Sequence, residues 1–226
     1  MKKKLLYVLP AAFIIIALTG YFTLYNSGQM NSSEKVTSMS GAAKADTEKL
    51  CCSEYMKKDP AADFTDNSVY QLNSKWNNEF NKKVSLGALK GQKVVMAMIF
   101  ASCTYACPLI VNDMRKVEQQ LPEGENSDVT FLLVSIDPDR DTPRALLDYS
   151  KKQNLDLSHW ELLTGSKSDI RSLAALLGFK YKKNDNGDYV HSNLINVFNK
   201  EGEVVLQHEG LNKDVQDIVK ELKAIN

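Results

Sequence analysis

Two cysteines, Cys103 and Cys107, carry the most reactive chemistry in the sequence. Three residues separate them, an apolar run precedes them, and Pro108 follows directly. Two thiols at this spacing can form a redox-active disulfide, or they can hold a soft cation such as Cu(I) or Zn(II) as thiolates. A purely structural disulfide is the conservative interpretation of an isolated pair. The residues alone leave these possibilities open.

The cysteine pair is expected to join a buried strand to a helix. Residues 94–100 are continuously apolar and include β-branched residues, which is typical of a strand buried on both faces. Apolar residues then recur at helical spacing, and a helix that begins at Pro108 leaves the two cysteines on a loop. Because a helix N-terminus stabilises a thiolate, at least one cysteine should have a lowered pKa, and Cys107 is nearer to that end than Cys103.

Strand patterns and helix patterns alternate along the rest of the chain. Residues 129–136 predict a second buried strand, and residues 141–152 begin with a capping residue and an early proline, which indicates a helix. This order predicts parallel strands and an α/β thioredoxin-like fold with an N-terminal β-hairpin. The remaining expected elements are the N-terminal hairpin (68–72 with 83–86), a helix (168–178), a second hairpin (194–198 with 204–207) and a final helix capped by Asn212.

The N-terminus predicts one membrane-spanning segment. Lysines at positions 2–4 precede residues 5–25, which are uncharged and mainly apolar. This run has roughly the 20 residues that cross a bilayer as a helix, and it is longer than the about 7–15 apolar residues of a signal peptide. We expect residues 1–26 to be a transmembrane anchor or uncleaved signal. The lysines then lie on the cytoplasmic side, and the rest of the chain lies outside the cytoplasm at the cell membrane.

A linker is expected between this anchor and one folded domain. Residues 27–62 are rich in serine and charged residues without apolar periodicity, which is typical of a flexible linker. Residues 63–226 are long enough for one domain. The linker contains adjacent Cys51 and Cys52, for which reactive thiols or an ordinary disulfide are the simpler interpretation and a soft docking or copper-relay site is the alternative.

Composition argues against one large class of function. The 226 residues include 28 basic and 28 acidic side chains, without a long basic run beyond the N-terminus. This balance gives no reason to expect nucleic-acid binding. The four cysteines are too few for a disulfide scaffold and are better suited to metal or redox chemistry.

Three segments, in the same order, resemble those of the Sco/SenC family. They are residues 100–108 (FASCTYACP), residues 135–143 (SIDPDRDTP) and His191 with the serine that follows it. The resemblance implies a thioredoxin-like fold in which Cys103, Cys107 and His191 bind copper. Two thiolates and one imidazole are a soft ligand set that suits Cu(I), with Cu(II) also possible.

The resemblance implies that the protein is a copper metallochaperone. Its expected role is delivery of copper to the copper A site of cytochrome c oxidase, with subunit II as the partner. The alternative is a thiol-disulfide oxidoreductase in which Cys103 and Cys107 are the catalytic redox-active pair. Both roles use the same cysteines, and they need not exclude each other.

The chain departs from the family pattern beside the histidine. Similar proteins have an acidic residue immediately before it, whereas this chain has Val190, with Asp188 two positions further back. A carboxylate near a ligating imidazole fixes its tautomer and orientation, so the sequence leaves open whether Asp188 compensates. In the acidic segment, Asp141 is expected to cap a helix and Asp137 to belong to a turn.

Overall fold

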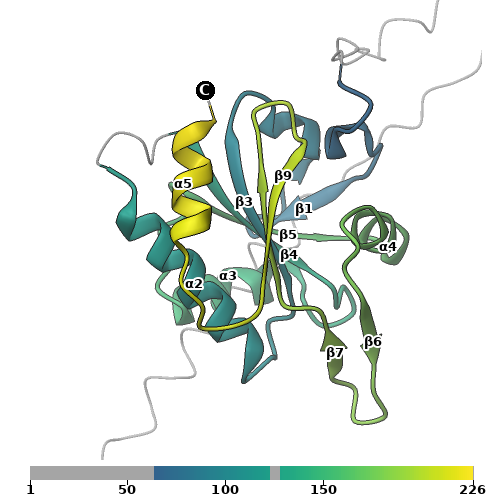
Figure 1. Ribbon diagram of the computed structural model, residues 1–226. Helices are drawn as coiled ribbons and strands as arrows, with labels where there is room; N and C mark the ends of the chain where they lie inside the picture. Colours follow the sequence, from purple (N-terminus) through teal and green to yellow (C-terminus); the bar gives the residue numbers. More distant parts are fainter. Residues whose placement is uncertain (1–63, 123–127, 226) are drawn as a thin grey trace, which may run out of the picture. The chain divides into compact units, whose positions relative to one another are not determined.

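The structure, a computed structural model, describes residues 64–122 and 128–225 (Figure 1). The expected anchor, the linker and the pair Cys51 and Cys52 lie outside these ranges. Within the described ranges, no helix has both the length and the apolar character required to cross a membrane.

A seven-stranded sheet in the order β2-β1-β5-β4-β3-β8-β9 forms the centre of the domain. The strands β3, β4 and β5 run parallel, and β8 pairs antiparallel with β3. Residues Val94 to Ile99 are 0 % exposed, as expected for a strand covered on both faces. Both predicted central strands and their parallel pairing are therefore confirmed. The bounds are β3 (Lys93–Ile99), β4 (Val129–Ser135), β5 (Trp160–Gly165), β8 (Leu194–Phe198) and β9 (Val204–Glu209).

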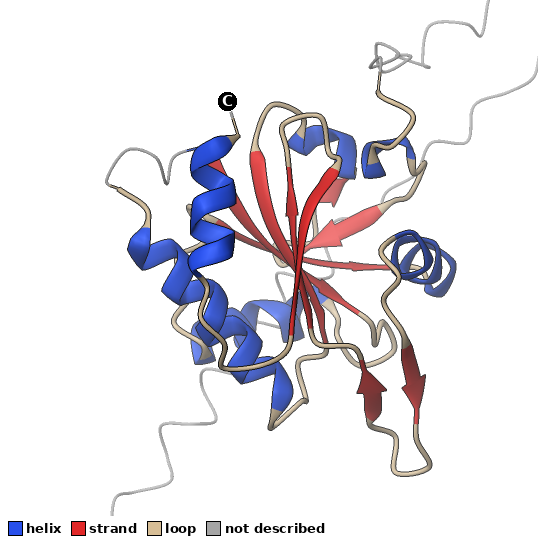
Figure 2. Ribbon diagram, viewed as in Figure 1, coloured by secondary structure: helices blue, strands red, loops and turns tan. Residues whose placement is uncertain are grey.

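Within residues 64–122 and 128–225, four α-helices cover the sheet. In Figures 1 and 2, α2, α3 and α5 lie on one side of the sheet and α4 lies on the other. The apolar residues of α2 face the core, as their helical spacing predicted. The predicted cap of the last helix was wrong, because α5 begins at Gln216 with Val215 at the N-cap position. The main-chain N–H of Asn212 donates to Asp113 Oδ2 at 2.8 Å. The bounds are α2 (Ala106–Gln120), α3 (Pro143–Lys152), α4 (Lys167–Leu176) and α5 (Gln216–Ala224).

The N-terminal hairpin exists, but its first strand lies later than predicted. Residues 68–72 contain the short 3-10 helix η2 (Val69–Gln71) instead of a strand, because Ser68 Oγ accepts a hydrogen bond from the Tyr70 main chain at 3.2 Å. The hairpin pairs β1 (Trp76–Asn78) with β2 (Lys83–Val84). A second 3-10 helix, η3 (Leu86–Leu89), follows β2.

The N-terminal hairpin joins the parallel strands through pairing of β1 with β5, a strand that was not predicted from the sequence. In the β1–β5 pairing, Trp76 lies opposite Gly165. A Cβ atom at Gly165 would lie only 2.6 Å from the Trp76 ring, so the glycine makes room for this buried side chain. Close packing of these two residues thus fixes the edge of the sheet.

A hairpin that was not predicted lies outside the main sheet. Strands β6 (Tyr181–Lys183) and β7 (Tyr189–His191) form a separate two-stranded sheet. Figure 1 shows it extending away from the main sheet, below α4. Because β7 ends at His191, this hairpin positions the third predicted metal ligand.

Candidate metal centre

The two cysteines lie where β3 leads into α2. Cys103 is partly exposed in the loop, whereas Cys107 is 0 % exposed in the first turn of the helix. The helix begins at Ala106, two residues before the predicted start at Pro108. Proline is tolerated there because the first four N–H groups of a helix have no partner within the helix. One of those groups, the main-chain N–H of Cys107, donates to Cys103 Sγ at 3.3 Å.

The lowered thiol pKa belongs to Cys103. A hydrogen bond from the Cys107 side chain, together with main-chain N–H groups of Cys107 and Tyr105, lowers the pKa of Cys103 to about 5, although partial burial opposes this effect. The hydrogen bond with Cys103, together with burial, raises the pKa of Cys107. The cysteine nearer to the helix is thus the less acidic one, because its side chain donates a hydrogen bond to the sulfur of its partner and a free N–H group of the helix points at the same sulfur.

His191 reaches the cysteine pair from the β6–β7 hairpin. Its Nε2 atom lies 3.8 Å from Cys107 Sγ, and its Nδ1 atom lies 2.7 Å from the main-chain oxygen of Ser192. When Nδ1 carries the proton and donates it to this oxygen, the lone pair of Nε2 faces the thiols. Phe179 stacks on the imidazole with ring centroids 5.8 Å apart. A main-chain carbonyl and an aromatic ring therefore orient the imidazole.

Asp188 does not compensate for the missing acidic neighbour of His191. Its carboxylate is 57 % exposed and lies 3.9 Å from an Arg140 nitrogen. The orienting hydrogen bond comes instead from Ser192, directly after the histidine in the sequence. No pattern in the sequence indicates this contact, because a main-chain carbonyl group is present at every residue.

Asp137 fastens the β6–β7 hairpin to the end of β4. Its buried carboxylate accepts a hydrogen bond from the Tyr189 hydroxyl at 3.2 Å and forms an ion pair with Arg140. Arg140 also donates to the main-chain oxygen of Gly187 at 2.8 Å. The expected turn role of Asp137 is thus only part of its contribution. Tyr189 was not predicted, although its spacing of two residues from His191 places both side chains on one face of the strand.

Asp141 holds the loop that carries Cys103 in place through hydrogen bonds. The prediction that Asp141 caps a helix was therefore wrong. Its Oδ2 atom accepts hydrogen bonds from the Ala101 main chain at 3.0 Å and from Ser135 Oγ at 2.6 Å. Thr142 caps α3 instead, because its side chain accepts from Ala145. The Asp141 carboxylate is buried, which raises its pKa and shields its hydrogen bonds from water.

The structure brings all three predicted ligand side chains together. The sulfur atoms of Cys103 and Cys107 and a ring nitrogen of His191 lie within 4.8 Å of one another. Ligand atoms that share one ion at about 2.0–2.3 Å lie at most about 4.6 Å apart. Small side-chain movements would therefore suffice for all three atoms to bind one ion, and their softness suits copper.

Comparison with known proteins identifies the family. Residues 66–226 match the family model described as SCO1/SenC. The chain belongs to the SCO1/SenC family. A SCO1 homolog from Bacillus subtilis is 32 % identical over 152 residues, which cover 65 % of this chain and 78 % of the homolog.

Two further relatives carry informative names. A Stutzerimonas stutzeri protein whose name refers to copper binding is 30 % identical over 111 residues, which cover 46 % of this chain and 51 % of that protein. The structure of BsSco, described as having a disulfide switch and as a member of the Sco family of cytochrome c oxidase assembly proteins, is 28 % identical with a TM-score of 0.59. That match covers 67 % of this chain and 90 % of BsSco. It supports the predicted thioredoxin-like α/β architecture.

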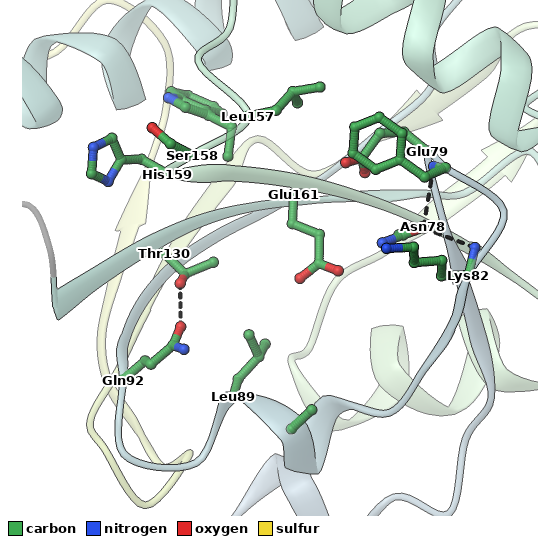
Figure 3. Close-up of a pocket in the computed structure, with 13 residues that line it drawn as sticks. Asn78, Glu79, Lys82, Leu89, Gln92, Thr130, Leu157, Ser158, His159 and Glu161 are labelled. Atoms are coloured by element: carbon green, nitrogen blue, oxygen red, sulfur yellow. Dashed lines mark hydrogen bonds between the residues drawn. The ribbon is translucent and has the colours of Figure 1, made fainter.

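A polar cavity of about 440 Å³ lies near the starts of the parallel strands β3, β4 and β5, whereas the cysteine pair follows the end of β3 (Figure 3). The Glu161 carboxylate projects into it, near a hydrogen-bonded pair formed by Thr130 and Gln92. Burial, and then repulsion from Glu79, raises the pKa of Glu161. None of the three predicted ligands lines this cavity, although His159 does.

Proposed function

We propose that this protein binds one copper ion through Cys103, Cys107 and His191 and delivers it to the copper A site of cytochrome c oxidase subunit II. The observation that carries the proposal is the convergence of two sulfur atoms and one imidazole nitrogen within 4.8 Å. Such a low-coordinate, soft set suits Cu(I) and also accommodates Cu(II). The names of the Stutzerimonas protein and of BsSco support copper binding and oxidase assembly, respectively.

The proposed capture of copper follows from the properties of the two thiols. Cys103 is partly exposed and has the lower pKa, so its thiolate is the first ligand available to incoming copper. Cys107 is buried and has a raised pKa, so it releases its proton when it becomes a ligand. His191 then completes the set through Nε2. Copper leaves by exchange of these ligands for the soft ligands of the acceptor.

The proposed setting is the outer side of the cell membrane. Residues 1–26 would anchor the chain, residues 27–62 would serve as the linker, and residues 63–226 would form the copper-binding domain. This organisation rests on the apolar N-terminal run and the lysines before it. It would keep the domain near a membrane-bound acceptor.

A thiol-disulfide oxidoreductase is the second candidate, favoured by the lowered pKa of Cys103, about 5. The Cys103 thiolate would attack a disulfide of the acceptor and form a mixed disulfide, releasing one acceptor thiolate. Cys107 would then attack Cys103, form the Cys103–Cys107 disulfide and release the second acceptor thiolate. Two electrons thereby pass to the acceptor. Reduction of acceptor cysteines and copper delivery are compatible.

Replacement of His191 separates these roles. Because two thiols suffice for exchange, His191→Ala should keep an oxidisable cysteine pair but bind copper more weakly, with a larger loss for Cu(II) than for Cu(I). His159→Ala is the matched control, since His159 lines the distant cavity. The measurements are copper stoichiometry and affinity of the reduced full-length chain, thiol reductase activity, and oxidase assembly in cells.

The outcomes distinguish the two functions. If His191→Ala abolishes oxidase assembly while reductase activity survives, copper handling is the essential role. If assembly continues normally, copper delivery is contradicted and the oxidoreductase replaces it. The protein that retains His191 should bind no copper tightly once Cys103 and Cys107 are oxidised, because a disulfide offers no thiolate. Replacing Cys51 and Cys52 with serine in all samples prevents these residues from contributing copper ligands.

A further inference from the structure

A shallow groove lies on the β6–β7 hairpin, and His191 is one of the residues that line it. Side chains alternate between the two faces of a strand, so Lys182 and Val190 lie opposite the face shared by Tyr181 and His191. The groove has a volume of about 360 Å³. It is lined by Lys180, Tyr181, Lys182, Val190, His191 and Ser192. It is thus part of the element that holds one of the three proposed copper ligands.

The groove combines an exposed apolar side chain with positive charge. Val190 is 69 % exposed, and Tyr105, between the two cysteines, is 75 % exposed. These are the two most exposed large apolar side chains in the described ranges, and both adjoin proposed ligands. Isolated exposed apolar residues are common, but an apolar centre with a charged rim is typical of protein interfaces.

The two lysines of the groove have no acidic partner within residues 64–122 and 128–225. Neither Lys180 nor Lys182 forms an ion pair there. Lys183, on the opposite face, lies 3.8 Å from Asp137. The acidic residues of the hairpin turn, Asp185 and Asp188, do not line the groove. The groove therefore presents uncompensated positive charge around an apolar side chain.

We propose that this groove docks an acidic, partly apolar polypeptide segment of the protein that exchanges copper with the site. The inference rests on the proposed function and adds the chemistry of the partner. The lysines would attract the acidic groups and Val190 would contact an apolar side chain between them. Such complementarity increases the rate of association and selects the partner. An anionic membrane is a poorer match, because membrane-binding clusters have about 4–8 basic residues.

Binding of a synthetic acidic peptide tests the groove separately from copper. The probe is a fluorescein-labelled peptide of alternating glutamate and leucine, and its control replaces each glutamate with glutamine. Fluorescence anisotropy measures binding to the reduced, copper-free full-length chain at about 50 mM and about 500 mM salt. The glutamate peptide should bind more tightly than its control, and high salt should weaken its binding.

Matched variants assign this binding to the groove. Lys180→Gln with Lys182→Gln should weaken binding of the glutamate peptide by about 2- to 25-fold, since each exposed ion pair contributes about 1.4- to 5-fold. Lys220→Gln with Lys223→Gln removes the same charge from exposed positions on α5 and should have no comparable effect. Copper stoichiometry and thermal unfolding, measured on the same samples, should not change in any variant.

Several results would overturn the proposal. These are equal binding of the two peptides, no binding up to about 1 mM peptide, or an equal loss in the α5 variant. Groove-dependent binding to phosphatidylserine vesicles without peptide binding would assign the surface to a membrane instead. A wild-type chain that binds the peptide through the groove but binds no copper would contradict the proposed function alone. Normal copper binding with no peptide binding would contradict the groove alone.

Discussion

The metal centre stabilises a negatively charged side chain, whereas the polar cavity destabilises one. At the ends of β3 and β4, hydrogen bonds lower the pKa of Cys103 to about 5. Near the start of β5, burial and the neighbouring Glu79 raise the pKa of Glu161. The cavity has a volume of about 440 Å³, yet the soft ligands and the hydrogen bonds that support them lie at the other end. The presence of a cavity therefore does not by itself identify a reactive site.

Placement of hydrogen-bond donors explains this difference. Cys103 receives hydrogen bonds from the Cys107 side chain and from two main-chain N–H groups, which stabilise its thiolate. Glu161 receives a stabilising hydrogen bond from Asn78, but desolvation and like charge outweigh it. The comparison predicts that changes at the metal centre have large effects on reactivity, whereas changes at Glu161 have small effects on stability.

The largest expected effect is in the pH dependence of alkylation. In the reduced, copper-free protein, the rate at Cys103 should rise with pH around a midpoint near 5, because only the thiolate reacts. In denaturant the midpoint should move to about 8.5. Iodoacetamide labelling with site-resolved mass spectrometry measures both, and Cys107 should stay protected in the folded protein. An alkylation midpoint near 8.5 in the folded protein would show that the fold does not lower the pKa of Cys103. The contrast with Glu161 would then be lost.

A smaller effect is expected for the carboxylate beneath the Cys103 loop. Asp141→Ala leaves the Ala101 N–H and the Ser135 hydroxyl without their shared acceptor, so the free energy of unfolding should fall by about 2–4 kcal/mol. Asp141→Asn is the matched control, since its amide oxygen can still accept and the loss should be smaller. Urea denaturation measures both variants. Equal losses would show that charge, and not the hydrogen-bond acceptor, is what the loop requires.

The smallest expected effect is at the cavity. Because the pKa of Glu161 is raised in the folded protein, its charged form destabilises the fold at neutral pH. Glu161→Gln should therefore raise the free energy of unfolding at pH 7 by no more than about 1 kcal/mol. The gain should shrink as pH falls through the raised pKa, where the native carboxyl takes up a proton. Urea denaturation at several pH values checks this, and a change in copper affinity would contradict the separation of the two regions.

The sequence by itself determined the elements whose signals are local. The apolar runs predicted β3 and β4, helical spacing predicted α2 apart from its first residues, and the cysteine spacing indicated the chemistry. These predictions depend on neighbouring residues, which is why periodicity and turn chemistry suffice. His191 came from the family resemblance instead, because it lies 84 residues from Cys107 and a single histidine has no periodic signal.

Tertiary structure decided how these parts work together. The roles of Asp137 and Asp141 depend on partners from other elements, as does the pairing of Trp76 with Gly165. Cap and turn signals in the sequence describe only the nearest residues, so they gave incomplete or wrong roles for these aspartates. Hydrogen bonds from the Cys107 side chain, and then from the main-chain N–H groups of Cys107 and Tyr105, gave Cys103 the lower pKa. Their arrangement depends on where the helix begins relative to the loop, which sequence spacing alone did not fix.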